Sequence, residues 1–379
     1  MSHNTYNDLS RIAGDDPVTA VWLTAVLRGA SALPCGDVLT VEERPNATAF
    51  NSIITHLTLT YSPDAPANAP TRLLLKRNLS AAWAIRDAAR EVAFYRLVAP
   101  HAAHLPMLVH CYGAAFDAER GISFILLDDL SDTHVTPISR ERVLALDGVP
   151  SEDHIHGVID ALAHFHAYWW EHPLLGEETL PVHGWYRDRT AHDAFIHDAT
   201  ADWERFIAAE GASFPDDLRI LYERTLAGLP DIWEHYLADR VAGRRNLTLS
   251  NGDSYFAQFL CPNDPAGRTY LIDFQSPKAD FAALDLVYLF ATFWTPGQRQ
   301  GRETALLRRY HRTLQAHGIQ YGWDELLIDY RLMIRYMMFF PLWDYVNGSR
   351  RAYWWPKMHC LTGTFQDLHC AEILEDMFR

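Results

Sequence analysis

The chain has 379 residues, of which 49% are hydrophobic and 21% charged, a composition that is typical of a folded globular protein and excludes general disorder. At roughly 150 residues per domain, this length predicts two domains, or two lobes that share one cleft. The formal net charge of −15 argues against nucleic acid and against an anionic membrane as the main partner, because both attract a surplus of Lys and Arg. The same charge weakly favours a cationic small molecule.

The cysteines and the apolar segments indicate a cytoplasmic protein. The five cysteines lie far apart and form no C-x-x-C pair, so we expect reduced thiols. The first residues show no basic stretch followed by an apolar one, and we therefore expect no signal peptide. No segment approaches the roughly 18 consecutive apolar residues that a membrane span needs.

The N-terminal third is predicted to be mostly sheet with few helices. One helix is expected from Asp16, which can cap it, to Gly29, and a second from the capping residue Ser80 to Val98. A turn is expected at 44–48 and a loop at 62–70. Alternating or continuous apolar residues predict five strands, at 37–43, 51–61, 72–76, 107–116 and 121–127.

The character of the sequence changes after about Leu130, where apolar residues adopt helical spacing. Helices are expected at 152–165, 217–238 and 303–317, and throughout the aromatic-rich C-terminal residues. We therefore place a short hinge near Leu130, with one lobe at 1–130 and a second at 131–379.

The densest polar signal lies in two neighbouring segments, 249–260 and 270–275, each of which places an acid beside an apolar strand-like run. Asp253 and Asp273, with the amide of Gln258 between them in the sequence, can hold Mg²⁺ through oxygen atoms. A carboxylate that does not bind the metal can accept a proton from a hydroxyl nucleophile. This combination suits phosphoryl transfer, although an N-G-D sequence by itself is more often only a turn.

Two residues upstream strengthen the interpretation as a phosphoryl-transfer site. Lys76 ends an apolar strand, and Glu91 lies on the helix that follows. A Lys from a strand, paired with a Glu from the next helix, can hold the α- and β-phosphates of ATP. Either residue alone would be interpreted as a solvated surface side chain. The specific signal is the order in which Lys76 and Glu91 precede Asp253, Gln258 and Asp273 in the sequence.

Several fragments together carry a resemblance to known kinases. Asn251-Gly252-Asp253, Gln258 five positions later, and Ile272-Asp273-Phe274 are similar to the signature H-G-D-x-x-x-x-N followed by I-D-F/W. Further similar fragments are found at 126–130, 162–167 and 285–289. The chain thus resembles the aminoglycoside phosphotransferase, choline kinase and ecdysteroid-kinase-like group of small-molecule kinases.

The resemblance implies an α+β, protein-kinase-like bilobal fold, with a small antiparallel-sheet N-terminal lobe, a large helical C-terminal lobe, and ATP and Mg²⁺ bound between them. It implies transfer of the γ-phosphoryl group to a hydroxyl of a small molecule. Asp253 would be the catalytic base, and Gln258 and Asp273 the metal ligands. The remaining implied roles belong to Lys76 as phosphate clamp held by Glu91, the backbone near Leu127 and Asp128 at the adenine, and Asn251 and Asp285 as support for the catalytic segment.

Three departures from the signature leave a second interpretation open. Asn251 replaces His, Gln258 replaces Asn and is one methylene longer, and the predicted phosphate-covering loop at 44–50 contains no glycine. A pseudokinase that binds a nucleotide or small ligand without turnover is therefore the alternative. A metal-dependent hydrolase that uses the two Asp residues is a third hypothesis, but it leaves Lys76 and Glu91 unexplained.

The acceptor site is expected in the aromatic C-terminal region. Trp343, Asp344 and Trp355 could hold a cation or a sugar-like ring, and the acidic charge favours an amino-sugar or another cationic alcohol. The alternative is that these residues only pack helices together. The histidines near His164 and His166 show no familiar zinc spacing, and we predict no metal site there.

Overall fold

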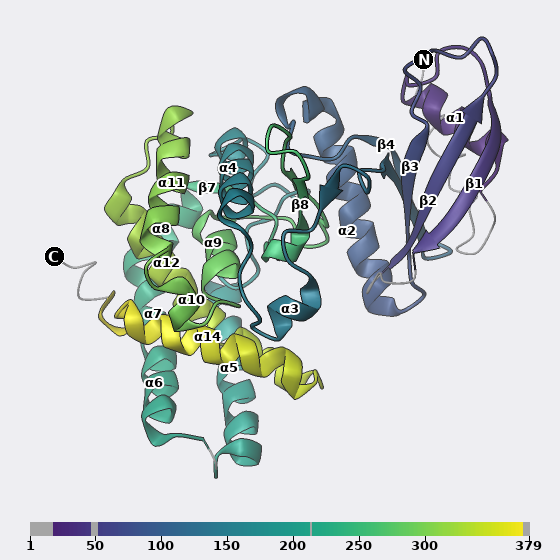
Figure 1. The fold of residues 1–379 in the computed structure, drawn as a ribbon. Coiled ribbons are helices and arrows are strands. Elements are labelled where there is room, and N and C mark those ends of the chain that lie inside the picture. Colours follow the sequence, from purple (N-terminus) through teal and green to yellow (C-terminus); the bar gives the residue numbers. More distant parts are fainter. Residues whose placement is uncertain (1–17, 47–51, 213, 374–379) are drawn as a thin grey trace. The chain divides into compact units, whose positions relative to one another are not determined.

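The computed structural model describes residues 18–46, 52–212 and 214–373, and Figure 1 shows the elements that they form. The chain divides into two compact units. Unit 1 comprises Met1–Val135 together with Pro262–Asp264 and Ile272–Pro277, and unit 2 comprises Thr136–Cys261, Pro265–Leu271 and Lys278–Arg379. The division follows chain order only in part, because the chain returns to unit 1 in two short segments that the expected boundary near Leu130 did not include. The second of these segments carries Asp273.

Unit 1 is built on a five-stranded sheet whose neighbouring strands are all antiparallel, in the order β1-β2-β3-β5-β4. Its elements are α1 (Ala20–Gly29), β1 (Val38–Asn46), β2 (Ser52–Tyr61), β3 (Arg72–Asn78), α2 (Ala82–Val98), the 3-10 helix η1 (Ala99–His104), β4 (Cys111–Asp117), β5 (Ile122–Asp128) and β6 (His134–Val135). The five strands expected from the sequence are all present.

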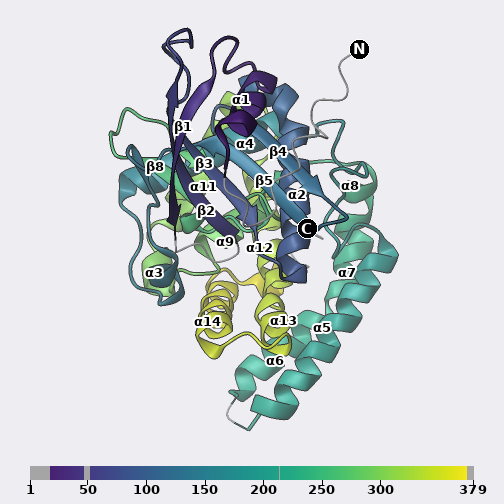
Figure 2. The same cartoon turned by 90° about the vertical axis from the view of Figure 1, so that its right-hand side faces the viewer.

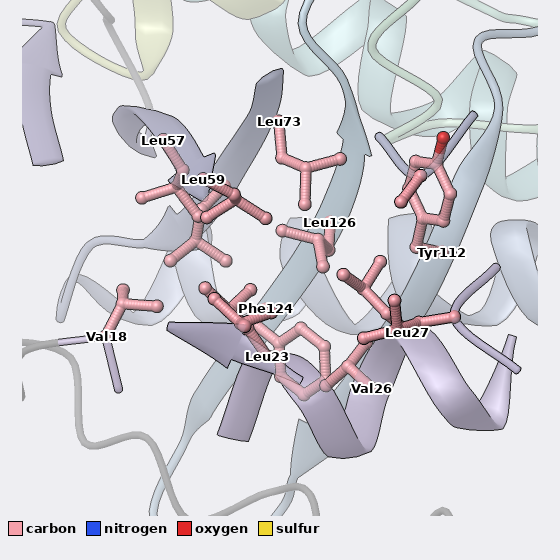
Figure 3. Packing of buried hydrophobic residues seen from close by; sticks show 14 of the residues in the cluster. Val18, Leu23, Val26, Leu27, Leu57, Leu59, Leu73, Tyr112, Phe124 and Leu126 are labelled. Carbon is pink, nitrogen blue, oxygen red and sulfur yellow. The ribbon is translucent and has the colours of Figure 1, made fainter. Parts of the chain in front are cut away.

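The hydrophobic core of unit 1 lies between α1 and one face of this sheet. Leu23, Val26 and Leu27 of α1 point toward apolar side chains of the strands, as Figure 3 shows. Strand β3 contributes Leu73 and Leu75, both completely buried. Because successive side chains of a strand point to opposite faces, Lys76 lies on the other face, which carries α2.

Unit 2 is mainly helical. Its elements are α3 (Arg140–Leu144), α4 (Glu152–Trp169), α5 (Arg189–Glu210), α6 (Asp216–Ala227), α7 (Leu229–Ile232), the π-helical turn η2 (Trp233–Leu237), α8 (Ala238–Ala242), β7 (Leu247–Ser250), η3 (Phe256–Gln258), β8 (Phe259–Pro262), β9 (Tyr270–Leu271), β10 (Lys278–Phe281), α9 (Ala283–Phe290), α10 (Pro296–Arg299), α11 (Glu303–Ala316), α12 (Trp323–Met337), α13 (Phe340–Val346), α14 (Arg351–Asp367) and η4 (Cys370–Glu372). Two short antiparallel pairs, β7 with β10 and β8 with β9, carry the polar segments singled out in the sequence.

Helix α9 is the centre of unit 2. Every residue from Ala283 to Phe290 is buried, and the helix packs against α12. Helix α4 packs on α11 and on β7, while α13 and α14 lie side by side, as Figure 2 shows. A helix that is apolar all round belongs in a protein core, and its only charged residue, Asp285, is thereby held in the interior. Among the described residues, no helix is long and apolar enough to cross a membrane.

Four local predictions were wrong or incomplete. Thr19, not Asp16, caps α1 by accepting a hydrogen bond from the backbone of Trp22, and Asp16 itself lies outside the described residues. Helix α2 begins after Ala81 without any side-chain cap, so Ser80 does not cap it. The predicted helix 217–238 is divided near Pro230 among α6, α7 and η2.

The fourth difference concerns the turn expected at 44–48. Strand β1 continues through Pro45, and Asn46 pairs with Ile54 of β2. Because β1 is an edge strand, the missing N–H of proline costs no ladder hydrogen bond if it faces away from β2. The last two residues of that predicted turn lie outside the described residues.

The core assignment predicts a large difference between two leucines of the same sheet. Leu126 of β5 is completely buried, whereas Leu39 of β1 is 58% exposed. Leu126→Ala should lower the free energy of unfolding by about 2–5 kcal/mol because it leaves a cavity, and the control Leu39→Ala should change it by less than about 0.5 kcal/mol. Urea unfolding followed by tryptophan fluorescence measures both variants, and equal effects would contradict the assignment.

Candidate active site

Unit 1 brings Lys76, Glu91 and Asp273 together into one cluster. The Nζ atom of Lys76 lies 2.9 Å from Oε1 and 2.7 Å from Oε2 of Glu91, and 2.6 Å from Oδ1 of Asp273. All three side chains are largely buried, with exposed fractions of 15% for Lys76, 5% for Glu91 and 16% for Asp273. Residues separated by up to 197 positions in the sequence therefore share one ionic contact.

The local structure explains why these three side chains meet. Lys76 projects from β3 toward α2, and Glu91 occupies the buried side of that helix. The segment after β9 is anchored on α2 by Phe274, whose ring stacks on that of Phe94 at 3.9 Å between centroids. Asp273 adopts a left-handed backbone with φ of 63°, an uncommon conformation for a residue other than glycine. The stacked ring and this backbone conformation hold the carboxylate against Lys76.

The cluster contains one ammonium group and two carboxylates. Burial lowers the pKa of Lys76, but the neighbouring carboxylates of Asp273 and Glu91 outweigh that effect and raise it, so the lysine stays protonated. Burial and the second carboxylate raise the pKa of Glu91, although Lys76 opposes them. One lysine does not neutralise both acids, and the excess negative charge is suited to a cation held through oxygen atoms.

A small recess lies beside Lys76 within unit 1. Its polar lining includes three residues that the sequence analysis missed: Asn78, Asp87 and Gln275. Asn78 accepts hydrogen bonds from the backbone and hydroxyl of Ser123 and donates to the carbonyl of Gly121. The signal that could have found Asn78 is its position two residues after Lys76, since such residues share one face of a strand.

Unit 2 carries the second predicted segment, which follows β7. Gly252 has φ of 79°, so a side chain at this position would be strained. The side-chain oxygen of Asn251 accepts the backbone N–H of Asp253 at 3.2 Å. The amide nitrogen of Gln258 donates to Oδ2 of Asp253 at 3.4 Å. The two residues that depart from the kinase signature therefore both contact Asp253.

Asp285, which is buried in the interior of unit 2, binds the backbone of this segment. Its oxygens accept hydrogen bonds from the hydroxyl of Ser250 at 2.7 Å, the backbone of Asn251 at 2.9 Å and the backbone of Gly252 at 3.0 Å. The ring of His166 lies 3.0 Å from the same carboxylate. Burial would raise the pKa of Asp285, but the hydrogen bonds from His166, Ser250 and Gly252 lower it overall. A single completely buried carboxylate thus fixes the backbone that leads to Asp253.

The predicted hinge lies at the end of β5. Leu127 is buried, and Oδ1 of Asp128 accepts a hydrogen bond from the hydroxyl of Tyr112 at 2.7 Å. The next residue, Asp129, faces the other way and binds His56 and Arg72. Burial opposes ionisation of Asp129, but hydrogen bonds from the Ser131 backbone and His56 lower its pKa to about 2.

The three residues proposed for the acceptor are not gathered into one open site. Asp344 is buried, and its carboxylate lies 2.7 Å from Nζ of Lys357. Trp343 is 53% exposed and stacks on Phe340, whereas Trp355 is 39% exposed and lies beside Arg351. The carboxylate that was expected to bind a cationic acceptor is therefore paired with a lysine of its own chain.

The donor chemistry of the predicted metal ligands fits Mg²⁺. Asp273 supplies a carboxylate and Gln258 an amide oxygen, and Mg²⁺ prefers such hard oxygen ligands while keeping several waters. In the part of the chain that the structure describes, no group of three or more His, Cys, Asp or Glu side chains is placed to hold a metal ion.

The sheet of unit 1 with its lysine–glutamate pair, and the helices and Asp285-held segment of unit 2, define the kinase-like fold of small-molecule phosphotransferases. The family model described as the ecdysteroid kinase-like family matches residues 48–322. The chain therefore belongs to this family, and the predicted α+β kinase-like fold is confirmed. Its family is one of small-molecule kinases.

The chain is similar to solved structures of small-molecule kinases, and one of these, with a TM-score of 0.51, supports the fold. The choline kinase of Cryptosporidium parvum is 10% identical, with a TM-score of 0.51, over 89% of this chain and 91% of that chain. A Plasmodium vivax ethanolamine kinase is 9% identical, with a TM-score of 0.48, over 97% and 92%. A spectinomycin phosphotransferase in complex with ADP and spectinomycin is 10% identical, with a TM-score of 0.43, over 96% and 99%. The comparison with curated protein sequences gave no significant match.

The contacts of Asp285 predict a specific loss of stability. Asp285→Asn places amide hydrogens among groups that donate, and should lower the free energy of unfolding by about 3 kcal/mol at pH 7. Since folding lowers the pKa of this acid, its contribution is complete above the usual Asp range and is lost as the pH falls through the lowered value. The difference between wild type and variant should therefore shrink in acid.

Thermal unfolding across pH measures this effect. The matched control is Asp198→Asn, at an exposed position of α5, which should leave the melting temperature nearly unchanged. Equal melting temperatures for the Asp285 variant and wild type at neutral pH would refute the supporting role.

Proposed function

We propose that this protein is an ATP- and Mg²⁺-dependent kinase that transfers the γ-phosphoryl group to a hydroxyl of a small molecule. The observation that carries the proposal is the buried contact of Lys76 with both Glu91 and Asp273. A strand lysine held by a helix glutamate is the arrangement that positions nucleotide phosphates in kinases, and membership of a small-molecule kinase family supports the same activity.

In this proposal each residue of the cluster has a separate task. Lys76, oriented by Glu91, binds the α- and β-phosphates, while the backbone at Leu127 and Asp128 meets the adenine. Asp273 and Gln258 supply the metal ligands. When bound, Mg²⁺ neutralises the charge of the β- and γ-phosphates.

Asp253 acts on the acceptor. Its carboxylate accepts the proton of the acceptor hydroxyl as the oxygen attacks the γ-phosphorus, and the bond from that phosphorus to the β–γ bridging oxygen breaks, which releases ADP. Asn251 holds the backbone of Asp253, and the amide of Gln258 restrains one of its carboxylate oxygens.

The state of the cysteines supports the location of the protein in a reducing compartment. All five are free thiols, and only Cys35 is exposed. We accordingly propose a cytoplasmic location, because disulfides are rare there and common in oxidising compartments.

The second candidate is a pseudokinase that binds a nucleotide without turnover. It is favoured by Gln258, whose amide nitrogen faces Asp253 at 3.4 Å in place of the shorter Asn of the signature. Turnover separates the two candidates, since both would bind the nucleotide.

Removal of the proposed base gives the first functional prediction. Asp253→Asn keeps the shape of the side chain but cannot accept the proton, so kcat should fall by about 10²–10⁴-fold. Binding of Mg²⁺ and ATP should change little, because the proposed phosphate and metal contacts remain. Coupled ADP release with a panel of hydroxyl acceptors measures turnover, and a variant that keeps most of its activity would exclude Asp253 as the base.

Ligand-dependent stability tests the nucleotide and the metal. ATP with Mg²⁺ at about 100 times the dissociation constant should stabilise the protein by about 2.7 kcal/mol, and ATP alone should stabilise it less. Asp273→Asn should remove the Mg²⁺-dependent part, whereas Asp253→Asn is the matched control that should keep it. A shift with ATP that is indifferent to Mg²⁺ would favour the pseudokinase, and the absence of any shift would overturn both candidates.

A further inference from the structure

Lys357 is the buried lysine of an aromatic box in unit 2. Its exposed fraction is 2%, and its Nζ lies 3.8 Å from the ring centroid of Tyr353, 4.4 Å from that of Phe340 and 5.9 Å from that of Phe293. The fourth side of this box is the carboxylate of Asp344, at 2.7 Å. We call these four residues around the lysine the ammonium cage.

The composition of the cage is that of a receptor for an organic cation. Aromatic faces attract an ammonium group through their quadrupole, and a desolvated contact of this kind is stronger than an exposed one. A buried carboxylate adds the opposite charge. Burial raises the pKa of Asp344, and the charge of Lys357 opposes that rise, so the acid depends on a cation beside it to remain ionised.

The cage lies next to the proposed catalytic segment, within the same unit. The ring of Phe293 is 5.6 Å from that of Tyr255, two residues after Asp253. Tyr288 packs its ring against Phe340 at 6.2 Å, and its pKa is raised by burial and by the charges of Asp253 and Asp344 together. The ammonium cage and the proposed base therefore both lie near Tyr288 of α9.

Stability alone is a weak reason for this arrangement. A buried ion pair costs desolvation on both charges, and replacing such a pair by apolar side chains of similar volume is often neutral or stabilising. The aromatic walls contribute packing with or without the lysine.

We propose that Lys357 is the built-in occupant of an ammonium-binding cage, and that it determines specificity by excluding a cationic group of the acceptor from this position. The part that concerns the acceptor rests on the proposed kinase function, whereas the cage itself does not. The acceptor presents a neutral or anionic group to this side of the site, contrary to the cationic alcohol expected from the overall charge.

The test uses a variant that empties the cage. Lys357→Ala removes three methylenes and the ammonium group, which together match n-propylammonium in size and charge. Addition of n-propylammonium chloride should raise the melting temperature of this variant by about 2 °C or more, because a ligand that binds only the folded state stabilises it. Equal concentrations of sodium chloride or n-propanol should not, since one lacks the shape and the other the charge.

Two matched proteins complete the binding test. Wild type and Lys357→Met have a filled cage and should show no shift specific to n-propylammonium. Because Lys357→Ala leaves a buried carboxylate unpaired and could fail to fold, the double variant Asp344→Asn with Lys357→Ala keeps the three rings without that charge. An n-propylammonium shift in neither variant would overturn the cage.

Turnover tests the part that concerns the acceptor. The ratio of kcat/KM for an amino alcohol to that for its neutral diol counterpart should rise at least about 10-fold in Lys357→Ala relative to wild type. A positive binding test with an unchanged ratio would overturn the role in specificity alone. If neither wild type nor variant showed turnover with any acceptor, the proposed kinase function and the proposed role in acceptor specificity would both be overturned. The binding test would still show whether the cage binds an ammonium group.

Discussion

The ionic contact between Lys76 and its two carboxylates is the constraint on which unit 1 depends. Lys76 comes from a strand and Glu91 from a helix, and Asp273 lies 197 positions after Lys76, in a segment that returns to unit 1. A buried lysine needs a partner, and a buried carboxylate needs one equally. The three groups therefore hold β3, α2 and the returning segment to one geometry, in which the proposed phosphate-binding lysine is fixed.

In unit 2, a single buried acid fixes the backbone that precedes Asp253. Asp285 sits on a helix that is buried on every side, and it is satisfied by Ser250, by His166 and by two backbone N–H groups of the turn before Asp253. The backbone of the proposed catalytic segment is thus part of the core rather than a mobile surface loop. The substitution of Asn251 for the signature histidine is accommodated there, because its side chain holds the Asp253 backbone directly.

The ammonium cage, in the role proposed for it, is an acceptor site whose cation-binding residues are retained but already occupied. Tyr353, Phe340 and Asp344 keep the chemistry that attracts a cation, and Lys357 satisfies that chemistry from within the chain. Overall negative charge is a poor guide to the acceptor in such a protein, since the local field at one buried site is set by the nearest groups. A family of kinases that share a fold can differ in substrate through one side chain of this kind.

The sequence by itself indicated a sheet-rich first third, a helical remainder and the family-like motifs, and it singled out Lys76, Glu91, Asp253 and Asp273 as candidate site residues, because periodicity and short motifs are local properties of the chain. It misplaced the caps of α1 and α2 and the end of β1, where tertiary pairing overrides local preference. Only the tertiary structure decided that Asp273 joins the sheet-rich unit and that Lys357 occupies the cage. The first contact joins residues 197 positions apart, and the second joins side chains of two different helices, α13 and α14. The burial that strengthens the attraction between such charges exists only once the chain has folded.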